Sequence, residues 1–191
     1  MGTAWAQVAS LVGPESAKVK ILDVYETVNL HIQDGKLKEA SELANTHLAT
    51  QPRDPQMRFL KGVIQHSQGQ IQDATATFTL LTQDYPELPE PYNNLGVLWS
   101  AQNQPEKARE ALEMALRLYP DYATAHENLG LTYLMLARQS YEKARKLLPV
   151  YAATSLGLKI DQLTLMLNQP PNKTSNTKTS NPSSKPGQNQ P

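Results

Sequence analysis

The chain has no cysteine, which excludes disulfide bonds, thiolate metal sites and a cysteine nucleophile, and fits either a reducing or an oxidising compartment. No apolar run approaches the ~18 residues that a membrane-spanning helix needs. Neither charge is in excess, with 18 basic and 18 acidic residues among 191. We therefore expect no membrane span, and no polybasic run is present that would bind a membrane surface.

The charges are unevenly distributed along the chain. The C-terminal segment from Pro170 onward contains Lys173, Lys178 and Lys185 and no acidic residue. This leaves 15 basic and 18 acidic residues in the rest of the chain, a net charge of −3. Because phosphate binding requires clustered lysine and arginine, a mildly acidic body argues against nucleic acid as the main ligand.

Patterns typical of catalytic or metal sites are missing as well. The histidines, His31, His47, His66 and His126, form no i, i+4 pair and have no carboxylate at ligand spacing. His126 stands where a packing side chain is usual, so we expect it in the core. The sequence has no Gly-rich phosphate loop, nucleophile elbow or HExxH helix. We predict a protein that is not an enzyme and binds neither metal nor cofactor.

The two ends of the chain differ from its body. In the leader, residues 1–13, Ala4-Trp5-Ala6-Gln7 looks like the small-residue end of a secretory signal, although no apolar segment precedes it. An ordinary alanine-rich leader is the alternative. The signal remnant favours a periplasmic or otherwise exported location, with the cytoplasm as the alternative. Residues 169–191 are almost wholly Asn, Gln, Pro, Ser, Thr and Lys, so we predict a disordered tail.

The body, residues 14–168, is predicted to be helical throughout. Apolar residues recur three and four positions apart, and no stretch alternates strictly as a half-buried strand would. Gly35 and Gly69 can each take the left-handed conformation that closes a helix. Pro105 suits the first position of a helix, because its missing N–H is not needed there.

Three residue types recur at a spacing of 34 and in one phase. They are Pro52, Pro86 and Pro120, Ala40, Ala74 and Ala108, and Gly62, Gly96 and Gly130. Such a period indicates an array of one helical unit stacked on copies of itself. The glycines and alanines are expected where antiparallel helices cross most closely, and larger residues are expected to fill the gaps. The residues predicted to pack the repeats are Ala40, Gly62, Ala74, Phe78, Gly96, Trp99, Ala108, Gly130 and Tyr133.

The unit from Pro89 to Tyr122 carries the fullest pattern. It reads Tyr92-x-x-Leu95-Gly96-x-x-Trp99, followed by Ala108-x-x-x-Leu112, Ala115 and Pro120. This pattern resembles the tetratricopeptide repeat (TPR), and the resemblance covers about residues 21–149. It implies an all-α, right-handed superhelical solenoid of TPR helical hairpins. The chain would have about three full repeats, a fourth repeat with fused helices and a C-terminal helix.

The fourth unit, which begins at His126, lacks a turn. Nine positions separate Trp99 from Ala108 in the third unit, but only four separate Tyr133 from Ala137. Residues 134–140 contain no Gly, Pro, Asn or Asp that would break a helix. We predict one helix from about Ala123 to Leu148, roughly 39 Å long at ~1.5 Å per residue. A hairpin with a shifted, strained turn is the alternative.

A fused helix would leave apolar surface of the third unit uncovered. Residues 150–168 are predicted to form a further helix that could cover this surface. Alternatively, a second copy of the chain supplies the missing helix, which gives a swapped homodimer through the fourth repeat.

The resemblance also implies a binding site, because the first helix of each repeat lines the concave groove in which TPR proteins bind extended peptides or partner helices. By phase, the groove residues are Tyr25, Asn29, Ile32, Phe59, Val63, His66, Asn93, Val97, Ser100, Glu127 and Leu131. The alternative role for several of them is packing against neighbouring helices. TPR proteins that bind chaperone C-terminal carboxylates use a clamp of Lys, Arg and Asn. Here Tyr25, Phe59 and Thr124 stand where cations would be expected, so such a clamp is not supported.

We therefore expect a non-enzymatic adaptor or scaffold that binds a protein or peptide ligand in the groove, in the cell envelope. One alternative is a cytoplasmic secretion chaperone that uses the same groove. The other is a structural homo-oligomerisation module whose groove stays empty.

Overall fold

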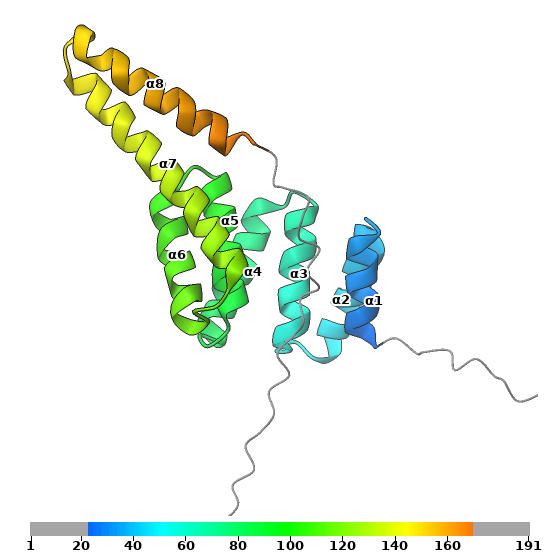
Figure 1. Ribbon diagram of the computed structural model, residues 1–191. Helices are drawn as coiled ribbons and strands as arrows, with labels where there is room; N and C mark the ends of the chain where they lie inside the picture. Colours follow the sequence, from blue (N-terminus) through cyan, green and yellow to red (C-terminus); the bar gives the residue numbers. More distant parts are fainter. Residues whose placement is uncertain (1–22, 170–191) are drawn as a thin grey trace, which may run out of the picture. The chain divides into compact units, whose positions relative to one another are not determined.

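The computed structural model describes residues 23–169, and this part of the chain consists of helices without any strand (Figure 1). The helices are α1 (Val24–Gln33), α2 (Leu37–Thr50), α3 (Pro55–Ser67), α4 (Ile71–Asp84), α5 (Pro89–Ala101), α6 (Pro105–Leu118), α7 (Ala123–Leu147) and α8 (Val150–Leu167). The all-helical prediction is confirmed. The predicted leader, with its signal-like Ala4-Trp5-Ala6-Gln7, and the predicted tail from Pro170 onward lie outside the described residues.

The chain divides into two compact units, Met1–Thr132 and Tyr133–Pro191, and the boundary falls inside α7. In the first unit, α1–α2, α3–α4 and α5–α6 are helical hairpins, and contacts between α2 and α3 and between α4 and α5 join each hairpin to the next (Figure 1). Stacking of similar hairpins is the architecture that the repeated spacing predicts.

Each hairpin turns at one residue with a positive φ. These residues are Gly35 (φ 73°), Gly69 (φ 75°) and Asn103 (φ 56°), and they recur with the same period as the other repeat positions. The left-handed region carries no steric penalty for glycine, so the predictions for Gly35 and Gly69 are confirmed. Asparagine tolerates this region better than most residues with a side chain. Asn103 thus serves as the turn residue of the third repeat, a role that the sequence analysis did not identify.

Helix starts follow from aspartate and proline. The side chains of Asp23 and Asp54 precede α1 and α3, and each accepts a hydrogen bond from the backbone N–H three residues on. Pro55, Pro89 and Pro105 occupy the first position of α3, α5 and α6, where the missing N–H costs no hydrogen bond and the fixed φ suits the helix. The prediction for Pro105 is confirmed.

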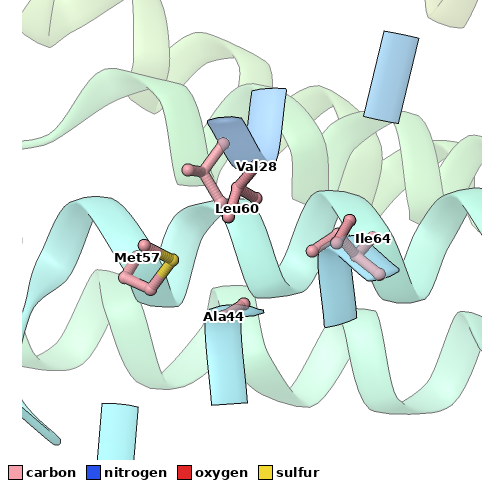
Figure 2. Close-up of a cluster of buried hydrophobic side chains, with 6 residues drawn as sticks. Val28, Ala44, Met57, Leu60 and Ile64 are labelled. Carbon is pink, nitrogen blue, oxygen red and sulfur yellow. The ribbon is translucent and has the colours of Figure 1, made fainter. Parts of the chain in front are cut away.

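Buried side chains connect each hairpin to the following helix. In the first cluster, Val28 of α1 and Ala44 of α2 contact Met57, Leu60 and Ile64 of α3 (Figure 2). A second cluster surrounds Phe78 and joins α4 to α5 and α6, and a third joins α6 to the first turns of α7. Burying one side chain of this size stabilises the fold by about 1.5–3 kcal/mol, so these clusters hold the first unit together.

The two helices of a hairpin cross at small residues. A Cβ atom at Gly62 would lie 2.7 Å from the Phe78 ring, and one at Gly96 would lie 2.4 Å from Leu112 Cγ. Both distances are shorter than van der Waals contact allows, so any residue but glycine would displace the facing side chain. The alanines of the second helices, Ala40, Ala74 and Ala108, are fully buried, and Trp99 is half-buried.

The fourth repeat has no turn. α7 is a single helix of 25 residues, which confirms the predicted fusion of the two helices. The five residues that carry the turn of the third repeat, Asn103 among them, have no counterpart before Ala137, which lies in the interior of α7. With no residue here that readily takes the left-handed conformation, the chain continues as a helix through this point.

Three residues on the first half of this fused helix differ from their counterparts in the third repeat. Gly130 and Tyr133, predicted to pack the repeats, are both exposed, whereas Gly96 is buried. His126 is exposed too, and its Nε2 donates to the carbonyl oxygen of Pro120 at 2.8 Å. The prediction of a core position for His126 is therefore wrong. The physical reason is the fused helix, which does not return over this face.

In the second unit, α8 runs beside the later half of α7 (Figure 1), which confirms the predicted further helix. The Lys159 ammonium lies 5.4 Å from the centroid of the Tyr141 ring, and Ile160 is buried. Two leucines of α8, Leu158 and Leu165, are exposed. Among the described residues, no helix combines the length and the apolarity that a membrane span requires.

Candidate protein-binding surface

The predicted groove residues lie on the first helices of the repeats, in three rows. The first row is Tyr25, Phe59, Asn93 and Glu127, the second is Asn29, Val63, Val97 and Leu131, and the third is Ile32, His66 and Ser100. Within a helix, positions i, i+4 and i+7 share one face, so each of α1, α3 and α5 contributes one residue to each row, and α7 contributes to the first two. We call these eleven residues the first-helix face.

The second row is open to solvent. Asn29 is exposed, Val63 and Val97 are half-buried, and Leu131 is 44 % exposed. Three apolar side chains thus stand at the same position in α3, α5 and α7 and keep some exposed surface, although Val63 also packs against the second core cluster. Because each is accessible without rearrangement, this row can bind apolar side chains of a partner.

The first row mainly packs the repeats together. The Tyr25 hydroxyl donates to Asp54 Oδ2, and the Phe59 ring lies 5.5 Å from the Phe78 ring. The Asn93 side chain is only 6 % exposed, and its Oδ1 accepts a hydrogen bond from Asn128 Nδ2 at 2.9 Å. This amide is therefore engaged within the protein between α5 and α7. Glu127, the last member of the row, is exposed.

The third row is intermediate. Ile32 packs against the first core cluster, and His66 is half-buried in the last turn of α3. The Ser100 and Thr132 hydroxyl oxygens lie 3.3 Å apart and share a hydrogen bond. Because Thr132 is fully buried and also donates to the carbonyl oxygen of Asn128, this contact extends the polar junction between α5 and α7.

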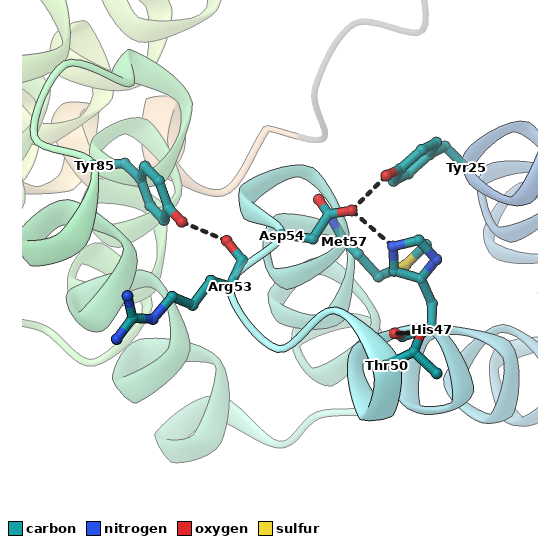
Figure 3. A network of polar contacts seen from close by, with 7 residues as sticks. All are labelled: Tyr25, His47, Thr50, Arg53, Asp54, Met57 and Tyr85. Atoms are coloured by element: carbon teal, nitrogen blue, oxygen red, sulfur yellow. Dashed lines mark hydrogen bonds and ion pairs between the residues drawn. The ribbon is translucent and has the colours of Figure 1, made fainter.

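A polar network that the sequence analysis missed joins the first repeat to the second (Figure 3). Asp54 Oδ2 accepts from the Tyr25 hydroxyl and lies 2.7 Å from His47 Nε2, while Asp54 Oδ1 accepts from the Met57 N–H at 3.0 Å. The one carboxylate therefore caps α3 and connects it to both helices of the first hairpin. A neighbouring contact, from the Tyr85 hydroxyl to the Arg53 carbonyl oxygen, ties the end of α4 to the same loop.

The environment of this carboxylate shifts two pKa values. Burial raises the pKa of Asp54, but hydrogen bonds from Tyr25, the Met57 N–H and His47 together lower it by more, so the pKa lies below its ordinary value. The hydrogen bond to Asp54, followed by burial, raises the pKa of Tyr25 to about 12. Both shifts favour an ionised Asp54 and a neutral Tyr25 at neutral pH. The sequence signal for this site was the Asp54-Pro55 pair at a helix start, but its partners could not be read from spacing.

Within the described range, residues 23–169, the His, Asp and Glu side chains form no group of three that could hold a metal ion. What these residues build is a row of accessible apolar side chains beside polar junctions that are satisfied internally. Such an arrangement is suited to contact with another polypeptide.

Comparisons with known proteins agree with this fold. Two profiles of the tetratricopeptide repeat family match the chain, over residues 25–89 and over residues 89–122. A search of curated proteins found no match. One similar solved structure is TTC0263, a thermophilic TPR protein from Thermus thermophilus. It shares 20% sequence identity with a TM-score of 0.58, and the match covers 76% of this chain and 81% of that one.

Two further similar structures contain a peptide. The first TPR of Spaghetti (RPAP3), bound to the HSP90 peptide SRMEEVD, shares 20% identity with a TM-score of 0.56, over 60% of this chain and 90% of that one. The Yersinia enterocolitica type III secretion chaperone SycD, in complex with a peptide of the translocator YopD, shares 16% identity with a TM-score of 0.53, over 63% and 92%. At these identities the likeness is one of fold. Together, the stacked hairpins, the glycine crossings and the two family profiles show that the chain belongs to the tetratricopeptide repeat family.

Proposed function

We propose that this protein binds an extended segment or a helix of another protein along its first-helix face. The observation that carries the proposal is the row formed by Val63, Val97 and Leu131, which repeats one apolar, accessible position in three successive first helices. A ligand with apolar side chains along one edge would contact these positions in turn. Asn29 and Glu127, both exposed, offer polar contacts beside the row.

The chemistry of this face limits the class of ligand. Tyr25 and Phe59 stand where a carboxylate clamp would need cations, and both are engaged in packing or hydrogen bonding within the protein. The proposed ligand is therefore recognised through apolar side chains, and a free C-terminal carboxylate is not required. Peptide complexes of two proteins that share the fold support a peptide as the class of ligand.

The test is a selection of peptides from a random displayed library on the full chain, followed by affinity measurements with variants. Leu131→Lys introduces a charge into the proposed row at a residue that is 44 % exposed, and it should weaken the selected peptides at least tenfold. Leu80→Lys is the matched control, because Leu80 is 52 % exposed on a second helix. Equal loss in both variants, or no selected peptides, would count against the proposal.

Two alternatives predict other outcomes. A secretion chaperone, the class to which SycD belongs, would use the same face but select segments of exported proteins in the cytoplasm. A purely structural module would associate with itself and leave the face empty, so that Leu131→Lys would change nothing. We place the adaptor in the cell envelope as part of the proposal, and fractionation of the native host tests this location.

A further inference from the structure

Gly130, the glycine of the fourth repeat, occupies the crossing position of a first helix, but no second helix of the described residues packs against it. At Gly62 and Gly96, the second helix of the same repeat comes so close that an added Cβ would clash with Phe78 or Leu112. At Gly130, the equivalent glycine of the fourth repeat, no atom of the described residues outside the glycine's own stretch of helix lies within 4 Å of an added Cβ. The first half of the crossing is thus built, and none of the residues that the structure describes takes the position of the second helix.

The chain contains the residues of the second helix that would cover Gly130, but within one chain they cannot fold back onto it. The spacing from Gly62 to Phe78 equals the spacing from Gly96 to Leu112, whereas the equivalent Tyr141 follows Gly130 five positions too early. The alanine that begins the pattern precedes the closing proline by 12 positions in both the third repeat and the fourth, Ala108 to Pro120 and Ala137 to Pro149. The second helix is therefore complete, and only the turn before it is missing.

The continuous helix α7 keeps Tyr141 away from Gly130 of the same chain. Eleven steps at ~1.5 Å per residue separate the two Cα atoms by roughly 16 Å along the axis. From the start of this connection at Leu134, residues 134–140 contain no residue that favours a helix break. An occupant with the right register must come from another molecule.

We infer that a second copy of this chain covers Gly130 with its own residues 137–148, and that its Tyr141 takes the place that Leu112 has over Gly96. The contact is reciprocal, because the Gly130 of each copy faces the Tyr141 of the other along two antiparallel α7 helices. The two-fold axis then passes midway between these positions, at residues 135–136. In an intact hairpin the same midpoint falls at the turn, near residue 104 in the third repeat. Such an isologous pair closes on itself and forms a dimer.

The inference does not depend on whether the first-helix face binds a ligand, and the tests keep the two apart. The first test is Gly130→Leu, examined by sedimentation of the full chain over a range of concentrations. In the single chain the added Cβ meets no atom of the described residues within 4 Å outside its own stretch of helix, whereas in the dimer the leucine overpacks two crossings. The dissociation constant of the dimer should therefore rise roughly tenfold to a hundredfold.

Gly157→Leu is the matched control, because an added Cβ at Gly157 also has no atom of the described residues within 4 Å outside its own stretch of α8. It should leave the dimer unchanged. A wild-type chain that stays monomeric at high concentration would overturn the inference. A dimer that Gly130→Leu leaves intact would overturn it equally.

The absence of native cysteines allows a direct test of the register. A chain carrying both Gly130→Cys and Tyr141→Cys cannot close a disulfide within α7, since a disulfide needs Cα atoms about 4.4–6.8 Å apart. Oxidation should therefore give a covalent dimer on a non-reducing gel. The control pair Gly130→Cys and Lys143→Cys, in which the second cysteine faces away from the first, should remain monomeric. Equal crosslinking of both pairs would refute the register.

A third variant restores the missing turn. A copy of residues 101–105, inserted between Leu134 and Met135, returns the spacing from Tyr133 to Ala137 to the nine positions that separate Trp99 from Ala108. The fourth repeat can then close on itself, so the variant should be a folded monomer with wild-type affinity for peptides selected on the first-helix face. A variant that still forms the wild-type dimer would contradict the swap.

Discussion

The third and fourth repeats begin alike and end differently. Both carry the Leu-Gly pair of the first helix, at Leu95-Gly96 and Leu129-Gly130. In the third repeat the chain turns at Asn103, and α6 covers Gly96 with Leu112. In the fourth the chain passes straight through Ala137 as α7.

The comparison separates two kinds of information that a helical repeat needs. The residues for packing are present in both repeats, since each has a glycine for the crossing and a complete second-helix pattern. Only the turn differs. A turn residue that accepts the left-handed conformation therefore decides whether the second helix folds back on its own first helix.

The largest effect is expected when the turn is removed from the third repeat. Deleting residues 101–105 leaves four positions between Trp99 and the key alanine, as in the fourth repeat. We expect α5 and α6 to fuse and Leu112 to lose its contact with Gly96. Loss of that burial alone costs about 2–5 kcal/mol, so the free energy of unfolding should fall by at least this amount in urea titrations. A deletion of the same length in the tail beyond Pro170 should change nothing.

A milder change leaves the turn in place and fills the crossing. Gly96→Leu should lower the free energy of unfolding by about 1–3 kcal/mol, because the second helix must move away from an overpacked contact. The same substitution at Gly130 should not lower it when urea unfolding is followed at a concentration low enough to keep the chain monomeric. A loss of similar size at both positions would show that the two glycines are equivalent.

Glycine should change stability with opposite signs at the turn of the third repeat and inside the continuous helix of the fourth. Asn103→Gly should retain or raise stability, because glycine adopts a φ of 56° without strain. Ala137→Gly, in the interior of α7, should lower the free energy of unfolding by about 1 kcal/mol. Thermal melts of the two variants beside wild type would distinguish the signs. The same sign at both positions would mean that the turn does not distinguish these repeats.

The smallest effect should come from acid and should be confined to the first two repeats. Because the pKa of Asp54 is lowered in the folded protein, its contribution is present above the ordinary aspartate pKa, about 3.9, and is lost as the pH falls through the folded value. Lowering the pH from about 5 to about 2 should thus weaken wild type more than Asp54→Asn, which retains a capping oxygen, when the free energy of unfolding is measured in urea. Asp34→Asn, at an exposed pair with Lys36, is the control and should keep the wild-type slope.

Periodicity and helix-breaking residues were sufficient to predict the repeats, the glycine crossings at Gly62 and Gly96, and the fused helix. These features depend on local sequence: the spacing of small residues, a breaker at Gly35 and Gly69, and the lack of one between Tyr133 and Ala137. The observed α7 ends at Leu147, one residue before the predicted end. Local rules also explain the error at His126, which was placed by its motif position in a repeat that has no second helix of its own to bury it.

Side-chain contacts between repeats could not be predicted from the sequence. Asn93 was predicted to line the groove, but its carboxamide is engaged by Asn128 of the following repeat. The contact of Tyr25 and His47 with Asp54 likewise depends on how two hairpins stack.

Constant spacing in the sequence identifies which residues share a face of the repeats. It does not show which of these residues are already in contact with a neighbouring helix. That distinction reduces the accessible apolar part of the first-helix face to Val63, Val97 and Leu131.

The register that continues unbroken on both sides of the missing turn has an evolutionary consequence. A single in-frame loss of five codons is enough to turn one repeat of the third kind into one of the fourth kind. Such a deletion keeps every side chain that packs a helix crossing. Selection can therefore act on the oligomeric state without compensating mutations in the core. With the dimer that we infer, an array of this type would acquire or discard its partner copy in one genetic step.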